Sequence, residues 1–160
     1  MSLVLILLLA VLVGVVAGLR AMTAPAVVAW GAALGWIDVD GRWSEWVGHP
    51  ITVGVLTVLL LVELVTDQLP KTPSRKSTPQ FATRLITGAF AGAVIGSAFF
   101  HTFSAIGAGV IGAVLGTLGG YEARRRLVAA NGGRDLPIAL LEDAVAVGGG
   151  FLVVYLVSLV

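Results

Sequence analysis

The stretch GLRAMTAP, residues 18–25, decides how this chain folds. It interrupts an apolar run from Leu3 to Trp36 in which Arg20 is the only charged residue. A continuous helix over that run would be about 50 Å long, against a bilayer core ~30 Å thick. It would also hold Arg20 near mid-membrane, which costs ~2.5–3.5 kcal/mol on insertion scales. The stretch therefore predicts a break in the helix.

Two arrangements of the run 3–36 satisfy this constraint. In the first, Gly18 ends one helix, Thr23 caps the next and Pro25 lies in its first turn, so that GLRAMTAP is mainly a turn near one membrane face. In the second, residues 3–36 form one broken helix or a re-entrant pair, which leaves five crossings and puts the amino terminus inside. Because irregular backbone at membrane depth is tolerated only where it is buried in protein or lines a cavity, the second arrangement makes GLRAMTAP a binding element.

The composition of the whole chain is that of an integral membrane protein. Of the 160 residues, 58% are hydrophobic and 12% are charged, whereas a soluble domain usually carries about 25% charged residues. Cysteine is absent, which excludes disulfides, thiolate metal sites and cysteine nucleophiles. The start does not read as a cleavable signal peptide, because no basic segment precedes Leu3. We expect a single transmembrane domain over residues 1–160.

Apolar runs later in the chain repeat the pattern of a short span, a polar turn and a proline. The sequence predicts an all-α, polytopic transmembrane helix bundle of five to six short spans, built from three repeated helical hairpins. The first hairpin is the one that could be broken or re-entrant. The hairpins cover approximately residues 3–36, 51–100 and 105–160.

Basic residues concentrate in the second and third of the predicted hairpin turns. Basic turns stay cytoplasmic, so six spans would put both termini outside. The arginines of the third turn are also expected to meet anionic lipid. These topology residues are Lys71, Arg75, Lys76, Arg124, Arg125 and Arg126.

Glycines recur every four residues in two of the later spans. Such a glycine zipper lets helix backbones approach closely in lipid, where no hydrophobic drive joins helices. Packing within one chain explains the stripes; the alternative is that one stripe joins copies of the chain, and we favour a homo-oligomer. The predicted packing glycines are Gly88, Gly92, Gly96, Gly112, Gly116 and Gly120.

Several ionisable residues fall inside or beside the apolar spans, at similar depths near the predicted turns. Arg84 and Glu142 each follow a turn proline by five residues, which is about 7 Å of helix. Glu63 and Asp67 lie four apart and share a helix face. The sequence thus predicts a charge layer, because intramembrane charges normally face the bundle interior and pair. Its members are Arg20, Glu63, Asp67, Arg84, Glu122, Glu142 and Asp143.

The charge layer permits two functions. As a site, it would bind or move a small polar or ionic solute through a transporter or channel-like protein, with the arginines attracting an anionic group and the carboxylates carrying a proton or cation. Alternatively, the charge layer is structural, and its ion pairs hold together a non-transporting scaffold or lipid-binding module. These pairs would be Arg84 with Glu63 or Glu142, and Arg20 with Asp67 or Glu63. No phosphate-binding loop, GxSxG or HExxH occurs, so we expect no enzyme, cofactor, metal site or nucleic-acid partner.

The polar signatures also resemble a known family. GLRAMTAP, ELVTDQLPKTPSR, the arginine of FATRLITGAFAGA, GGYEARR and LLEDAVA are similar to the motifs of a family of small bacterial inner-membrane proteins of unknown function. The resemblance covers nearly the whole chain. It implies a bacterial inner-membrane location and gives weight to Arg20, Glu63, Asp67, Lys71, Arg84, Glu142 and Asp143, but it implies no activity.

Overall fold

The computed structural model describes residues 2–69 and 77–160. Within these ranges the chain is all helical, which confirms the all-α part of the predicted fold class. The elements are α1 (Leu3–Leu19), α2 (Thr23–Ala33), the short 3-10 helix η1 (Glu45–Gly48), α3 (Pro50–Thr66), α4 (Thr78–Ala98), α5 (Thr102–Ala130) and α6 (Leu136–Ser158).

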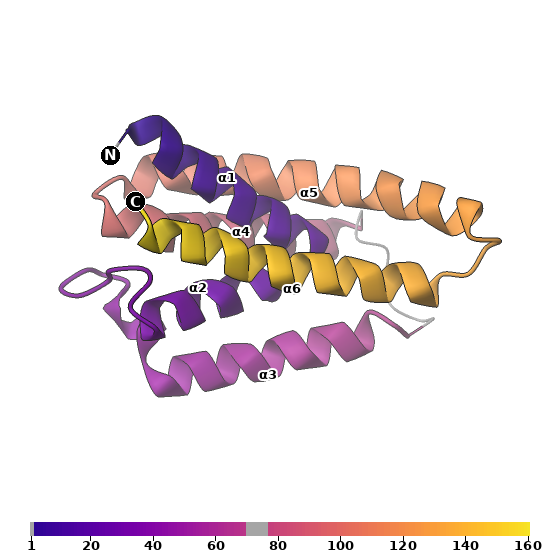
Figure 1. The fold of residues 1–160 in the computed structure, drawn as a ribbon, viewed down its shortest axis with the longest axis horizontal. Coiled ribbons are helices and arrows are strands. Elements are labelled where there is room, and N and C mark those ends of the chain that lie inside the picture. The colour runs from indigo at the N-terminus through magenta and orange to yellow at the C-terminus, as the bar shows by residue number, and fades with distance from the viewer. Residues whose placement is uncertain (1, 70–76) are drawn as a thin grey trace.

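The six α-helices lie roughly along one common direction (Figure 1). Both termini and the segment between α2 and α3 lie at one end of the bundle, at the left of the figure. At the other end α5 and α6 extend past α3 before the chain turns between them. Proline lies in the first turn of α3, α4 and α6, where its missing N–H has no helical partner to lose.

Three helices are long and apolar enough to cross a membrane. These are α4 with 21 residues, α5 with 29 and α6 with 23, and the apolar helices α1, α2 and α3 are shorter, with 17, 11 and 17 residues. The chain is therefore a helical protein with the character of a membrane protein.

The polar turn expected after the fifth span is shorter than the sequence indicated. Residues 122–130 continue α5, and the turn covers only residues 131–135. The continuation has a local cause: alanine, leucine and arginine are good helix formers, and the Glu122 carboxylate pairs with Arg125 and Arg126 one turn later.

Close contact between glycine-rich faces joins α1, α4 and α5. Gly88, Gly92 and Gly96 of α4 lie against the backbone or alanine side chains of the first half of α5. On α5, Gly112 and Gly116 lie against the carbonyl oxygens of Val11 and Val15 of α1, so an added Cβ would overlap backbone atoms. Close approach of this kind lets helices pack where lipid removes the hydrophobic drive. Gly120 is only half-buried.

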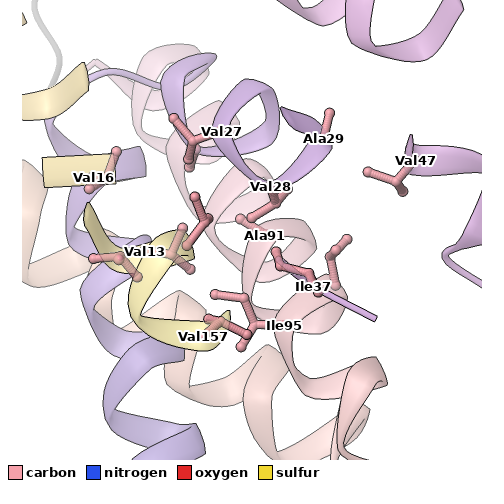
Figure 2. Close-up of a cluster of buried hydrophobic side chains, with 14 of the residues drawn as sticks. Val13, Val16, Val27, Val28, Ala29, Ile37, Val47, Ala91, Ile95 and Val157 are labelled. Atoms are coloured by element: carbon pink, nitrogen blue, oxygen red, sulfur yellow. The ribbon is translucent and has the colours of Figure 1, made fainter. Parts of the chain in front are cut away.

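Branched apolar side chains fill the remaining interior, mostly around the short helix α2. Figure 2 shows valines of α1, α2 and α6 meeting alanine and isoleucine of α4. The segment after α2 completes this core by inserting Ile37 and Val47, which are 1% and 0% exposed. Helix α2 is thereby buried on most of its surface, and its N-terminus is held at the level where α1 ends.

Candidate functional site

Arg20 lies at the centre of a buried group of charges at the end of α1. Its side chain is 1% exposed, and Nη1 donates to Oδ2 of Asp67 at 3.0 Å. Its Nε donates to Oδ1 of Asp143, and Nη2 lies 3.7 Å from Oε2 of Glu142. We call Arg20, Asp67, Glu142 and Asp143 the charge cluster. Three carboxylates thus converge on one guanidinium.

Three helix ends bring the charge cluster together. Arg20 is the C-cap of α1 and has an extended backbone, with φ −142° and ψ 113°, that interrupts the helix. Asp67 is the C-cap of α3, and Glu142 and Asp143 lie in the second turn of α6. Gln68 also donates from Nε2 to Oδ2 of Asp143 at 2.9 Å. The cluster therefore ties α1, α3 and α6 at one level.

Glu63 caps the N-terminus of α2 from a different helix. The backbone N–H groups of Ala21 and Met22 donate to its two carboxylate oxygens at 2.8 and 2.7 Å. The expectation that Thr23 would cap α2 is wrong, because Thr23 is the first helical residue and makes no side-chain cap. Its buried hydroxyl has no hydrogen-bond partner in the described part of the chain. A carboxylate suits this place because the N-terminus of a helix carries partial positive charge.

Arg84 serves the opposite end of the same break. Its side chain is buried, and Nη1 donates to the carbonyl oxygen of Gly18 at 2.7 Å. The hydroxyl of Thr117 points to the same oxygen at 3.5 Å. Gly18 does not end α1, which runs to Leu19; its place against α5 explains the glycine instead. A cation at the C-terminus of a helix satisfies carbonyls that the helix leaves unpaired.

A second arginine links the charge cluster to the surface. Arg124 of α5 donates from Nη1 to Oε2 of Glu142 at 3.3 Å. Its Nε and Nη2 donate to the two oxygens of Asp135, at 2.9 and 2.7 Å. The exposed fraction falls from 59% at Asp135 through 20% and 10% to 1% at Arg20. Alternating charges therefore run from the α5–α6 turn to the buried guanidinium.

Among the predicted site residues that the structure describes, Glu122 lies outside this network. Glu122 is 38% exposed, and its carboxylate accepts from Arg125 and Arg126 on its own helix. The predicted topology residues Lys71, Arg75 and Lys76 fall outside the described residues.

The chain matches a known protein family over most of its length. A model of the family described as a domain of unknown function, DUF4126, matches residues 7–159. The chain belongs to this family. The matched region contains the charge cluster, both residues that satisfy the break, and the glycine-packed helices. Neither a curated protein nor a solved structure shows a significant match to the chain.

Several contacts of the charge cluster in this DUF4126 chain were not predicted from the sequence. Asp135 and Gln68 are polar residues beside predicted turns, and nothing in their spacing distinguishes them from solvated turn residues. Arg124 was expected to define topology, whereas it also binds Glu142. One signal could have identified Arg124 and Asp135, namely their positions on either side of the third turn. Glu63 and Arg84 lie in the same way on either side of the second turn.

A small apolar slot opens next to the charge cluster. It has a volume of about 160 Å³ and lies between α5 and α6, next to the last residue of α1. Its walls include Leu19, Leu127 and Leu141, while Arg124 and Glu142 form its charged border. Glu142 therefore lies between the buried guanidinium of Arg20 and this apolar space.

Proposed function

We propose that this protein is a small integral membrane transporter or channel-like protein that binds or moves a small polar or ionic solute through the charge cluster. The observation that carries the proposal is the convergence of three carboxylates on the buried guanidinium of Arg20. Ionisable groups within membrane proteins are costly to bury and commonly mark ion and proton pathways.

The chemistry of the charge cluster favours a proton or a small cation as the mobile ion. Three carboxylates, those of Asp67, Glu142 and Asp143, lie within 3.7 Å of the guanidinium of Arg20. Carboxylates inside membrane proteins commonly belong to proton and cation pathways. Arg20 would act as the resident cation with which the mobile ion competes.

The orientation and assembly belong to the same proposal. We place the protein in the bacterial inner membrane as a multi-pass homo-oligomer with its basic turns cytoplasmic, surrounded by membrane lipids. The amino terminus lies at the same end of the bundle as the α2–α3 segment (Figure 1). That arrangement favours α1 and α2 as a hairpin, either two short crossings or a re-entrant pair, over one continuous broken helix.

Flux measurements in proteoliposomes test the proposal. Purified protein would be assayed for proton flux with a pH-sensitive dye and for sodium and potassium flux with ion-selective electrodes. The variant Glu142→Gln keeps the size of the side chain and removes its charge. Because an interaction with a charged group contributes about 1.5–3 kcal/mol, we expect this variant to lose about tenfold or more of the flux.

Glu122→Gln is the matched control, since it neutralises a carboxylate that pairs only with exposed arginines among the described residues. It should leave the flux unchanged. Absence of flux for all three ions, or equal flux in the two variants, would remove the charge cluster from the transport pathway.

A second function has one specific observation in its favour. Glu63 and Arg84 each satisfy a helix end at the break, which is a structural task. In a non-transporting scaffold or lipid-binding module the charge cluster would do the same. Glu142→Gln would then lower the free energy of unfolding without any effect on flux, and wild-type vesicles would be as ion-tight as empty ones.

A further inference from the structure

The slot between α5 and α6 has walls suited to hydrocarbon. Its lining consists of apolar side chains and small residues, apart from Arg124 and Glu142 at the border. The large members are Leu127, Ile138, Leu141 and Val145, and Leu127, Leu141 and Val145 are each about half exposed at the protein surface. An empty apolar space open to a bilayer loses dispersion contacts on every wall, so hydrocarbon that fits will fill it.

Size decides what kind of hydrocarbon fits. The slot measures about 160 Å³, close to the ~150 Å³ engineered apolar cavity that binds benzene, a ring of six carbons. A protein helix has a diameter of about 10–12 Å with its side chains and is too thick to enter. One acyl chain, inserted over part of its length, matches both the volume and the apolar lining.

Charge at the mouth of the slot selects the head group. Arg124 borders the slot, and Arg125, Arg126 and Arg134 lie on the same end of α5 and the following turn. Arg125 and Arg126 share the single carboxylate of Glu122. Asp135 offsets one further positive charge. Glu142 at the border of the slot offsets another, so the four arginines exceed the three carboxylates by one positive charge, which complements a lipid phosphate.

We infer that the slot between α5 and α6 is a binding site for one anionic membrane phospholipid, with an acyl chain against Leu127, Leu141 and Val145 and the phosphate near Arg124. Basic pockets between membrane helices on the cytoplasmic side are known places for such head groups. The inference stands apart from the transport proposal, because lipid binding is measured without any flux.

Native mass spectrometry of the protein in detergent provides the test. The protein would be titrated with dioleoyl phosphatidylglycerol, with dioleoyl phosphatidylcholine, and with glycerol phosphate as a head group without chains. We expect one phosphatidylglycerol to bind about fivefold or more tightly than phosphatidylcholine, since one arginine near the surface has about that effect. Glycerol phosphate should bind far more weakly than the lipid.

Two substitutions on α5 separate the slot from the general surface. Ala123→Phe fills the slot, and Ala129→Phe adds the same ring to the same helix at an exposed position outside its lining. Ala123→Phe should lose the tightest phosphatidylglycerol, whereas Ala129→Phe should keep it. Arg124→Gln should lower the affinity for phosphatidylglycerol to that for phosphatidylcholine. Equal affinity for the two lipids in the wild type, or unchanged binding in Ala123→Phe, would overturn the inference.

Discussion

Each charged side chain around the α1–α2 turn satisfies a group that the turn exposes. Glu63 accepts from the N–H groups of Ala21 and Met22, and Arg84 donates to the carbonyl of Gly18. Arg20 itself lies in the break, and carboxylates of two other helices surround its side chain. The cost of interrupting a helix inside a membrane protein is thus offset by side chains from elsewhere in the bundle.

Replacement of Arg20 should destabilise the protein strongly. The variant Arg20→Met leaves the largely buried Asp67 and Asp143 without their cation, and breaking a fully buried pair in this way costs about 3–5 kcal/mol, which sets the upper limit of the loss. The free energy of unfolding can be measured by circular dichroism during titration of detergent-solubilised protein with a denaturing detergent.

Two comparisons make this result specific. The double variant Arg20→Met/Asp143→Asn removes a charge of each sign and should lose less stability than Arg20→Met alone, because fewer uncompensated charges remain. Arg125→Gln, in an exposed pair, should change stability by less than about 1 kcal/mol. If Arg20→Met unfolds no more easily than Arg125→Gln, the charge cluster does not hold the helices together.

Among the helices, α5 has two distinct parts. Its first half lies against α1 and α4 through glycines and alanines, so that backbones meet without side chains between them. Its second half extends past α3 beside the first turns of α6 and carries the arginines (Figure 1). The first part positions α1 and therefore Arg20, and the second part brings Arg124 to Glu142.

A methyl group added in the first half of α5 should separate the helices. In Gly112→Ala the new Cβ would overlap the carbonyl oxygen of Val11, which is backbone and cannot rotate away. Overpacking of this kind costs about 1–3 kcal/mol, and we expect a value near the upper end. Thermal unfolding in detergent, followed by circular dichroism, measures the loss.

Gly107→Ala is the control on the same helix. A Cβ at Gly107 meets no atom within 4 Å, so this variant should be as stable as the wild type or slightly more stable, since alanine is the better helix former. Equal loss in both variants would mean that the close contact between α1 and α5 contributes nothing specific to stability.

The bundle as a whole has two chemically different ends. One end carries the termini, the α2–α3 segment and its tryptophans, whereas the other carries the charge cluster and the arginines of α5 (Figure 1). Such asymmetry gives a membrane protein its orientation, because basic segments stay on the cytoplasmic side. The charge cluster and the slot would then both lie on the cytoplasmic side.

The proposed orientation predicts the accessibility of single cysteines, which the natural chain lacks. Ser2→Cys and Asp40→Cys should react with a membrane-impermeant maleimide added outside intact cells, whereas Asn131→Cys should react only after the membrane is opened. All three positions are exposed at the protein surface. Labelling of Asp40→Cys but not Ser2→Cys from outside would instead support a single broken first helix with an internal amino terminus.

The sequence by itself determined the helical class, the membrane character and the break at residues 18–25. These follow from local quantities: the length of apolar runs, the cost of Arg20 in hydrocarbon, and the positions of proline and glycine. The close packing of Gly88, Gly92, Gly96, Gly112 and Gly116 follows from the same kind of pattern, since small residues repeat on one helix face.

Only the tertiary structure decided which charged groups meet. Asp67, Glu142 and Asp143 reach Arg20, while Glu63 and Arg84 turn to the backbone of the break. The sequence predicts only that these side chains lie at a similar depth in the membrane, and that does not decide their partners. The partners depend on how each helix is rotated about its axis and on which backbone groups of its neighbours lack a hydrogen bond. Thr23 illustrates the point, because its position predicted a cap for α2 that it does not form. The carboxylate of Glu63 instead accepts from the amides of Met22 and Ala21, which lie 41 and 42 residues earlier in the chain.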